Sequence, residues 1–147
     1  MKYAKFLVPI AGRAVDEDIV KSACVIARRS KGKVYIVHVI QVSRNLPLDA
    51  EIEDETAAGE KILASAEKIA DVMDCDAETE ILQAREVGPA IVDEAVERGV
   101  DMIVMGIDYK KRFGEWDMGS VVPYVLRNAP CRVLLWRGPM DQEQEKA

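Results

Sequence analysis

The stretch "DMIVMGIDYKKRFGEWDMGSVVPYVLRNAPCRVLLW", residues 101–136, contains two short apolar runs separated by a loop and a helical pattern. The runs "DMIVMG" (101–106) and "CRVLLW" (131–136) have the length and composition of strands buried in a parallel sheet. Between them, Ser120 stands directly before apolar residues that repeat at helical spacing, as an N-cap residue does. A strand, a helix and a second strand form the repeating unit of an α/β sheet, so this stretch predicts that fold class.

The same alternation extends back towards the N-terminus. Further strands are expected at residues 4–10, 33–40 and 77–84, and further helices from Asp16, along the apolar stripe 62–73, and between Pro89 and Gly99. Five strands alternating with four helices predict an open parallel sheet with right-handed crossovers and helices on both faces. We expect a single domain over residues 1–137, followed by a polar C-terminal tail at 138–147.

Charge and hydropathy argue against several classes of protein. The 147 residues carry 20 Lys+Arg and 26 Asp+Glu, a net charge of −6, whereas surfaces that bind nucleic acid are usually basic. The apolar part of the N-terminus ends at Gly12 and is too short for a membrane helix. Three cysteines, Cys24, Cys75 and Cys131, form no C-x-x-C pair, so we expect free thiols and a cytoplasmic protein. Neither a nucleic-acid partner nor a membrane partner is expected.

The residue types that commonly catalyse reactions or bind metals are not grouped in the sequence. His38 is the only histidine and lies in an apolar strand, where a core or strand-end position is expected. The acidic stretch "DAEIEDE" (49–55) precedes a helix, where the helix dipole favours acids. We therefore predict no catalytic residue and no metal site. An enzymatic activity, at most slow nucleotide hydrolysis, ranks behind a binding function and a scaffold function.

The loop from Gly106 to Ser120 has features of a phosphate site. In a sheet of this kind, ligands bind beyond the carboxyl ends of the strands, where the strand order reverses. Gly119 and Ser120 place backbone N–H groups at a helix N-terminus, which attracts anions, and "KKR" (110–112) adds positive charge. Pro123 removes a backbone donor that an N-cap serine commonly binds, which leaves the Ser120 hydroxyl for a ligand. The alternative is a solvated connection that binds nothing.

Taken in order, these segments resemble the universal stress protein family. "KFLVPIAG", "VHVI", "VDMIVMG" and "GSVVPYVLRNAPCRVLLW" are similar to that family's first, second and fourth strands and its closing helix and strand. The resemblance implies a Rossmann-like sheet in the order 3-2-1-4-5 and a homodimer formed through the last strand, at Val133, Leu135 and Trp136. One branch of the family binds an adenine nucleotide between strands 1 and 4, and other branches bind none.

The nucleotide-binding branch carries a Gly-x2-Gly-x9-Gly-[Ser/Thr] loop, and this chain keeps its length. Tyr109 stands where the second glycine belongs, Ala11 replaces an aspartate used on the ribose or base, and Val122 replaces a hydroxyl residue. Because a Cβ hinders positive φ and a ring fills space, Tyr109 is the main objection to a phosphate site. Asp108 would repel a phosphate unless Mg²⁺ or the neighbouring basic residues offset its charge.

The resemblance therefore implies a dimeric stress-response module that binds AMP, ADP or ATP, with or without Mg²⁺. The alternative is a dimeric scaffold of the same fold that binds no nucleotide. Recognition of the ribose should be weak, so 2′-deoxy forms should bind nearly as well. Matched residue by residue, the expected nucleotide site comprises Pro9, Ile10, Ala11, Val39, Met105, Gly106, Asp108, Lys111, Gly119, Ser120, Val121 and Val122.

Overall fold

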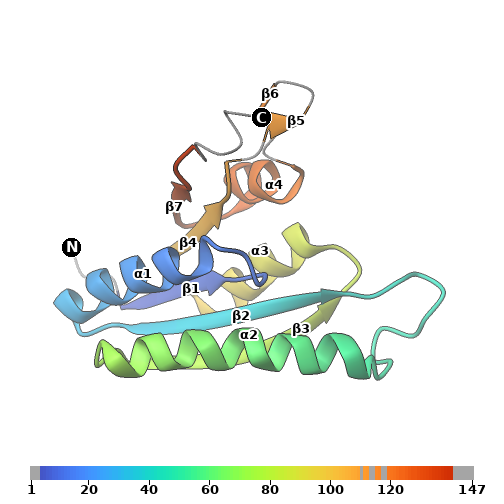
Figure 1. Ribbon diagram of the computed structural model, residues 1–147, viewed down its shortest axis with the longest axis horizontal. Coiled ribbons are helices and arrows are strands. Elements are labelled where there is room, and N and C mark those ends of the chain that lie inside the picture. The colour runs from blue at the N-terminus through green and yellow to red at the C-terminus, as the bar shows by residue number, and fades with distance from the viewer. Residues whose placement is uncertain (1–3, 110, 113–114, 117–118, 141–147) are drawn as a thin grey trace.

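The computed structural model describes residues 4–109, 111–112, 115–116 and 119–140, with the backbone alone at 111–112 and 115–116. Strands and helices alternate along most of the chain, as the sequence predicts (Figure 1). In order, the elements are β1 (Lys5–Pro9), α1 (Asp16–Ser30), β2 (Lys33–Gln41), α2 (Glu53–Val72), β3 (Ala77–Ala84), α3 (Val87–Arg98), β4 (Met102–Ile107), β5 (Lys111–Arg112), β6 (Glu115–Trp116), α4 (Val121–Asn128) and β7 (Arg132–Arg137).

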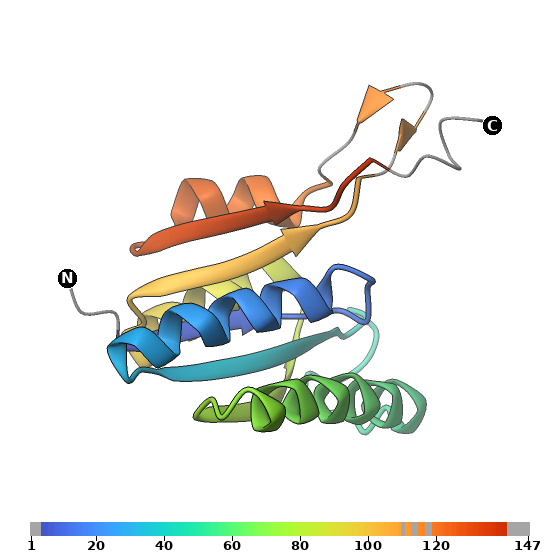
Figure 2. The ribbon, with the colours of Figure 1, turned by 60° about the vertical axis from the view of Figure 1, so that its left-hand side comes forward.

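The main sheet has five strands in the order β3-β2-β1-β4-β7, and all of its pairs are parallel. Because β7 is the fifth strand of this sheet, the expected order 3-2-1-4-5 is confirmed. The predicted strand bounds hold to within one residue. The antiparallel hairpin of β5 and β6 was not predicted. It lies beyond the carboxyl ends of β4 and β7 (Figure 2).

The central strand β1 supplies both hydrophobic cores. Phe6, Leu7 and Val8 are all 0% exposed, so the strand is buried on both faces as its continuous apolar sequence predicts. Phe6 and Val8 belong to the core beneath α1 and α2, whereas Leu7 belongs to the core beneath α3 and α4. Figure 2 shows α1 and α2 on one side of the sheet and α4 on the other. Burying one such side chain contributes about 1.5–3 kcal/mol.

Three helices end in the same backbone turn, with a left-handed residue after the last helical turn. These residues are Lys31 (φ 54) after α1, Asp74 (φ 54) after α2 and Gly99 (φ 61) after α3. In each case the following N–H bonds a carbonyl of the last helical turn, for example Cys75 N to Ala70 O at 2.9 Å. Gly99 therefore ends α3 as predicted. The other two turns use residues with a Cβ, which carry no sequence signal.

The start of α3 differs from the prediction. The helix begins at Val87, whereas Pro89 was expected to open it. Pro89 lies within the first turn, where a backbone N–H has no partner inside the helix, so its missing donor costs nothing there.

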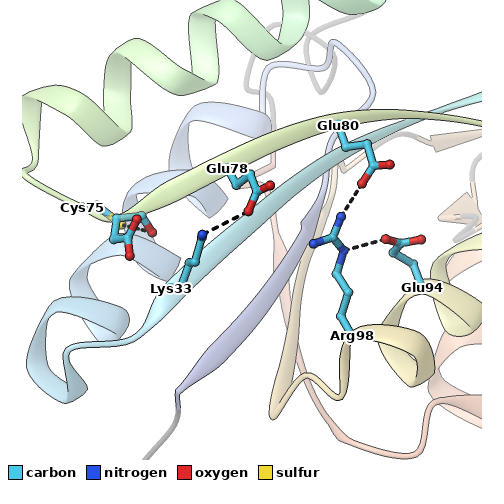
Figure 3. A network of polar contacts seen from close by, with 7 residues as sticks. Lys33, Cys75, Glu78, Glu80, Glu94 and Arg98 are labelled. Carbon is cyan, nitrogen blue, oxygen red and sulfur yellow. Dashed lines mark hydrogen bonds and ion pairs between the residues drawn. The ribbon is translucent and has the colours of Figure 1, made fainter.

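Charged side chains join the end of α3 to the face of β2 and β3 (Figure 3). The Arg98 guanidinium donates to Glu94 at 2.6 Å and also bonds the Glu80 carboxylate. It lies 4.4 Å from the centre of the Tyr35 ring. The Arg98 side chain is 23% exposed, so these contacts are partly shielded from solvent and hold α3 against the sheet.

The first turn of α1 approaches β4 very closely at Gly106. A Cβ built on Gly106 would lie 2.6 Å from Val15 Cγ2 and 2.7 Å from Ile19 Cγ2. Both distances are shorter than real Cβ contacts, so the side chains of Val15 and Ile19, or α1 itself, would have to shift. This glycine is therefore required by the packing of the helix on the sheet, a reason that differs from the phosphate contact suggested by its place in the loop.

We predict that Gly106→Ala lowers the free energy of unfolding by about 1–3 kcal/mol, because the added methyl group overpacks the contact with α1. Urea unfolding of the two proteins measures the difference. Val15→Ala removes the methyl groups of Val15, which include the nearer obstruction, and leaves Ile19 Cγ2 in place. In a double-mutant cycle, Gly106→Ala should lower the free energy of unfolding less beside Val15→Ala than alone, because part of the overpacking is relieved. Equal costs in both backgrounds would show that the packing argument is wrong.

Candidate functional site

The sheet opens at the carboxyl ends of β1 and β4. Among the described residues these two strands pair at Phe6–Met102 and Leu7–Ile103 and no further. By contrast, β1 remains paired with β2 up to Pro9, and β4 remains paired with β7 up to Ile107. β1 and β4 are also the strands between which the chain order reverses, the usual place for a ligand in an open α/β sheet.

A cavity of about 350 Å³ lies at this opening. Its volume falls within the range of sites for small molecules. It is bordered by the end of β1, the start of α1, β2, α3, the end of β4 and the start of α4. The lining residues are Pro9, Ile10, Ala11, Arg13, Asp16, Val39, Val87, Ile91, Met105, Gly106, Gly119, Ser120, Val121 and Val122.

Most of the residues expected at a ligand site line this cavity. Pro9, Ile10, Ala11, Val39, Met105, Gly106, Gly119, Ser120, Val121 and Val122 are all in its wall. Asp108 is not among the described lining residues. The side chain of Lys111 lies outside the described residues, as do Lys110 and the side chain of Arg112. The structure thus brings ten of the twelve expected residues together, and that they bind a ligand stays a prediction.

Four lining residues were missed in the sequence: Arg13, Asp16, Val87 and Ile91. Asp16 was expected only as the start of a helix. Val87 and Ile91 lie one turn apart on α3, and Ile91 fell within the helix expected between Pro89 and Gly99, whereas Val87 preceded it. Residues at i, i+4 spacing lie on one face of a helix, and such a face can pack in the core or line a cavity. The local sequence does not distinguish a core residue from a cavity residue.

The turn between β1 and α1 is closed by the Asp16 carboxylate. Asp16 Oδ2 accepts hydrogen bonds from Gly12 N at 2.7 Å and Arg13 N at 3.0 Å. Gly12 has φ +83, a conformation that favours glycine. Burial raises the pKa of Asp16, and the hydrogen bonds from the backbone of Gly12, Arg13 and Ala11 oppose that rise without cancelling it. A partly buried carboxylate therefore forms the cavity wall beside Ala11.

His38 has a structural role behind this turn. Its Nδ1 lies 2.9 Å from the Ile10 carbonyl oxygen, which can only accept, so Nδ1 carries the proton. On the other side, Gly59 of α2 packs so closely that a Cβ there would lie 2.9 Å from His38 Cδ2. The histidine therefore holds the backbone of Ile10 in place, as a strand-end residue was expected to do.

The opposite wall is the beginning of α4. Gly119 has φ +71, and a Cβ there would meet nothing within 4 Å, so its conformation rather than its space favours glycine. Ser120 is the N-cap residue, and its side chain makes no capping hydrogen bond. Pro123, in the first turn, has no N–H to offer this serine. The Ser120 hydroxyl and the first backbone N–H groups of α4 are thus placed to meet an anionic group.

The Tyr109 ring does not line the cavity. The Arg137 guanidinium, at the end of β7, lies 4.8 Å from the centre of this ring. A cation over an aromatic face at this distance is attractive. The ring therefore packs towards Arg137 at the end of β7 and is not among the described lining residues.

Within the described part of the chain, no group of three or more His, Cys, Asp or Glu side chains is arranged to hold a metal ion. Among those same residues, no helix is long and apolar enough to cross a membrane.

Comparison with known proteins shows what this arrangement is similar to. The model of the universal stress protein family matches residues 2–137. The universal stress protein MJ0531 of Methanocaldococcus jannaschii is 31% identical, over 95% of this chain and 85% of that protein. A universal stress protein from Archaeoglobus fulgidus has a similar structure, with a TM-score of 0.77 and 24% identity over 90% of this chain and 98% of its own. The structure of the universal stress protein from Archaeoglobus fulgidus in complex with dAMP has a TM-score of 0.71 and 24% identity, over 92% and 98% of the two chains.

The raised pKa of Asp16 predicts a pH-dependent difference between the wild type and Asp16→Asn. Because the folded state raises this pKa, the folded state binds the proton more tightly than the unfolded chain does. Wild-type stability attributable to Asp16 is therefore complete below the unfolded pKa and is lost as pH rises through the folded pKa.

In the Asp16→Asn variant, the side-chain amide keeps an oxygen that can accept hydrogen bonds from the turn, but the amide does not titrate. The variant should therefore not lose stability at this position as pH rises. Urea unfolding of both proteins across the acidic range measures the difference. The wild type should lose stability relative to Asp16→Asn as pH increases. A difference that is constant, or of the opposite slope, would contradict the assignment.

Proposed function

Because this chain belongs to the universal stress protein family, we propose that it is a cytoplasmic stress-response module that binds an adenine nucleotide in the cavity between β1 and β4. The observation that carries this proposal is the meeting of an apolar cavity with the N-terminus of α4 at the reversal point of the sheet. A similar protein was solved in complex with dAMP, which is consistent with a ligand of this class.

The two ends of the cavity suit the two ends of a nucleotide. Val39, Val87, Ile91 and Met105 supply apolar side chains against which a base can pack. At the other end, the Ser120 hydroxyl and the backbone of α4 offer hydrogen-bond donors to a phosphate. We therefore assign the phosphates of AMP, ADP or ATP to the α4 end and the base to the apolar end.

Recognition of the ribose should be weak. Ala11 has no polar side chain, and Oδ2 of the one carboxylate among the described lining residues, that of Asp16, already accepts from two backbone N–H groups of its own turn. A ribose hydroxyl therefore has only the remaining capacity of this carboxylate to bind. We expect ribose and 2′-deoxyribose nucleotides to bind with similar affinity. A bound Mg²⁺ would be held chiefly by the phosphates, since Asp108 is not in the cavity wall.

The second candidate function is a scaffold of the same fold that binds no nucleotide. It is favoured by the apolar character of much of the wall and by Ala11 in place of an acidic residue. In that case the cavity would be filled by other small apolar molecules or by none. No catalytic residue is proposed under either function.

We further propose a homodimer formed through β7. This strand is an edge of the sheet, paired with β4 on one side. Leu134 is 39% exposed, whereas Val133 and Leu135 pack against the core beneath α3 and α4. Trp136 packs against the core on the α1 side. An exposed apolar edge strand is a surface that natural proteins usually cover, and a second copy of β7 is its simplest cover.

The nucleotide proposal predicts that Ser120→Asp weakens the binding of nucleotides but not of adenosine. Aspartate caps a helix as well as serine does, so α4 should be retained, while the added charge repels a phosphate. Calorimetric titration should show at least a tenfold loss of AMP, ADP and ATP affinity, a difference of about 1.4 kcal/mol or more. Adenosine, which has no phosphate, should bind the variant and the wild type alike.

Ala64→Asp adds the same charge at an exposed position of α2 that is not in the cavity wall, and it should leave all affinities unchanged. The wild type should bind AMP and dAMP within a few fold of each other. If the wild type shows no saturable heat at millimolar nucleotide, the scaffold function replaces nucleotide binding. If Ser120→Asp binds AMP as the wild type does, the phosphate is not at α4.

The dimer proposal predicts that Leu134→Lys shifts the protein towards the monomer, because it places a charge on the exposed apolar face of the edge strand. Sedimentation equilibrium measures the mass. Leu134 is a sharper test than Leu135, whose replacement would also disturb the core. Val72→Lys on α2, at a residue that is 87% exposed, is the matched control and should remain dimeric. A monomeric wild type at micromolar concentration would exclude the dimer.

A further inference from the structure

Two cysteines that are far apart in the sequence meet in the structure. Cys24 lies on the inner face of α1 and is 0% exposed. Cys75 follows α2 and packs against the hydrophobic core to which Cys24 belongs. The two cysteines thus share one core, and their side chains interact with each other there. Both are free thiols, and the third cysteine, Cys131, belongs to the opposite core.

The turn that ends α2 fixes Cys75 in this position. Asp74 adopts φ 54, and Cys75 N bonds Ala70 O at 2.9 Å. In this type of helix end, the residue after the left-handed one turns its side chain back onto the helix and makes an apolar contact. Here the contact is made with the core beneath α1, where Cys24 lies. Figure 3 shows Cys75 where the chain passes from α2 into β3.

We propose that Cys24 and Cys75 form a reversible oxidation site, in which a peroxide converts the two thiols into an intramolecular disulfide. The site does not depend on the proposed nucleotide binding. A disulfide requires two sulfur atoms that can approach each other without moving the backbone far, and two thiols that interact within one core are placed for such an approach. A small oxidant can enter beside Cys75, which is partly exposed.

The chemistry balances with one peroxide for each pair of thiols. The Cys75 thiolate attacks the O–O bond of hydrogen peroxide, which forms an S–O bond and releases hydroxide that takes up the thiol proton as water. The Cys24 sulfur then attacks the sulfur of this sulfenic acid. The S–S bond forms, the S–O bond breaks, and the leaving hydroxide and the Cys24 proton give a second water. Two thiols are oxidised and one peroxide is reduced.

The surroundings favour slow rather than rapid oxidation at neutral pH. Burial raises the pKa of both thiols, so the thiolate fraction is small. Around Cys75, the Arg28 charge favours the thiolate, and the Asp76 charge disfavours it. The rate of disulfide formation should therefore increase with pH. Such a site responds to sustained oxidation, not to brief exposure.

The experiment uses a Cys131→Ser protein, so that only the pair remains. After treatment with hydrogen peroxide, the folded protein should lose the mass of two hydrogen atoms and resist alkylation in denaturant. Peptide mapping should find Cys24 joined to Cys75, and a reducing agent should reverse the change. Because the cross-link ties α1 to the end of α2, the midpoint of thermal unfolding should rise on oxidation and fall back on reduction.

Cys75→Ser, in the same background, is the matched control, because this partly exposed position tolerates a hydroxyl better than the buried Cys24 position does. It should show neither the disulfide nor the reversible rise in the unfolding midpoint. Two results would overturn the proposal. They are sulfinic acid at Cys75 with Cys24 still open to alkylation, and a covalent dimer through Cys75.

Discussion

The absence of a side chain at Gly106 sets the position of α1, and much of the structure depends on that contact. Val15 and Ile19 occupy the space that a Cβ would need. Their approach brings the first turn of α1 against β4, at the edge where β1 and β4 have ceased to pair. The turn that leads into the helix is consequently held over the end of β1, where the Asp16 carboxylate closes it. Core packing and cavity shape are thus two results of one close contact.

The cavity is electrostatically asymmetric because its two polar walls are satisfied differently. At the β1–α1 turn, the Asp16 carboxylate is partly buried and accepts two backbone hydrogen bonds, and the Arg13 charge influences it less than either. At the start of α4, a helix N-terminus with an uncapped serine side chain has a partial positive charge that nothing in its own helix neutralises. An anionic group is therefore favoured at α4 and disfavoured at Asp16. This difference alone orients a ligand that has one charged and one neutral end.

The sheet could be predicted almost completely from the sequence, because short apolar runs such as "KFLVP" are local signals of buried strands. The β5–β6 hairpin had no such signal, since its strands are two residues long and largely polar. Residues that follow strands, such as Ile10, could be assigned to the site because they meet at the carboxyl edge of any parallel sheet. Asp16 could not be assigned to the site in this way. It lies in a helix, and its carboxylate accepts hydrogen bonds from the turn before that helix, a contact for which the sequence has no signal. The packing neighbours of Gly106 and of the Tyr109 ring are distant in sequence, so no local pattern records them.

The cavity and the cysteine pair share helix α1, and the packing of that helix determines how strongly they can influence each other. Asp16 and Cys24 are separated by about 12 Å along the helix, at 1.5 Å per residue. A cross-link at Cys24 can change the affinity of a ligand only if the ligand binds a position of α1 that the cross-link disfavours. The contact of Val15 and Ile19 with Gly106 already holds the first turn against β4, so the cross-link has little freedom left to remove there. Oxidation should therefore act mainly on the stability of the α1–α2 face, and ligand binding mainly on the opening between β1 and β4.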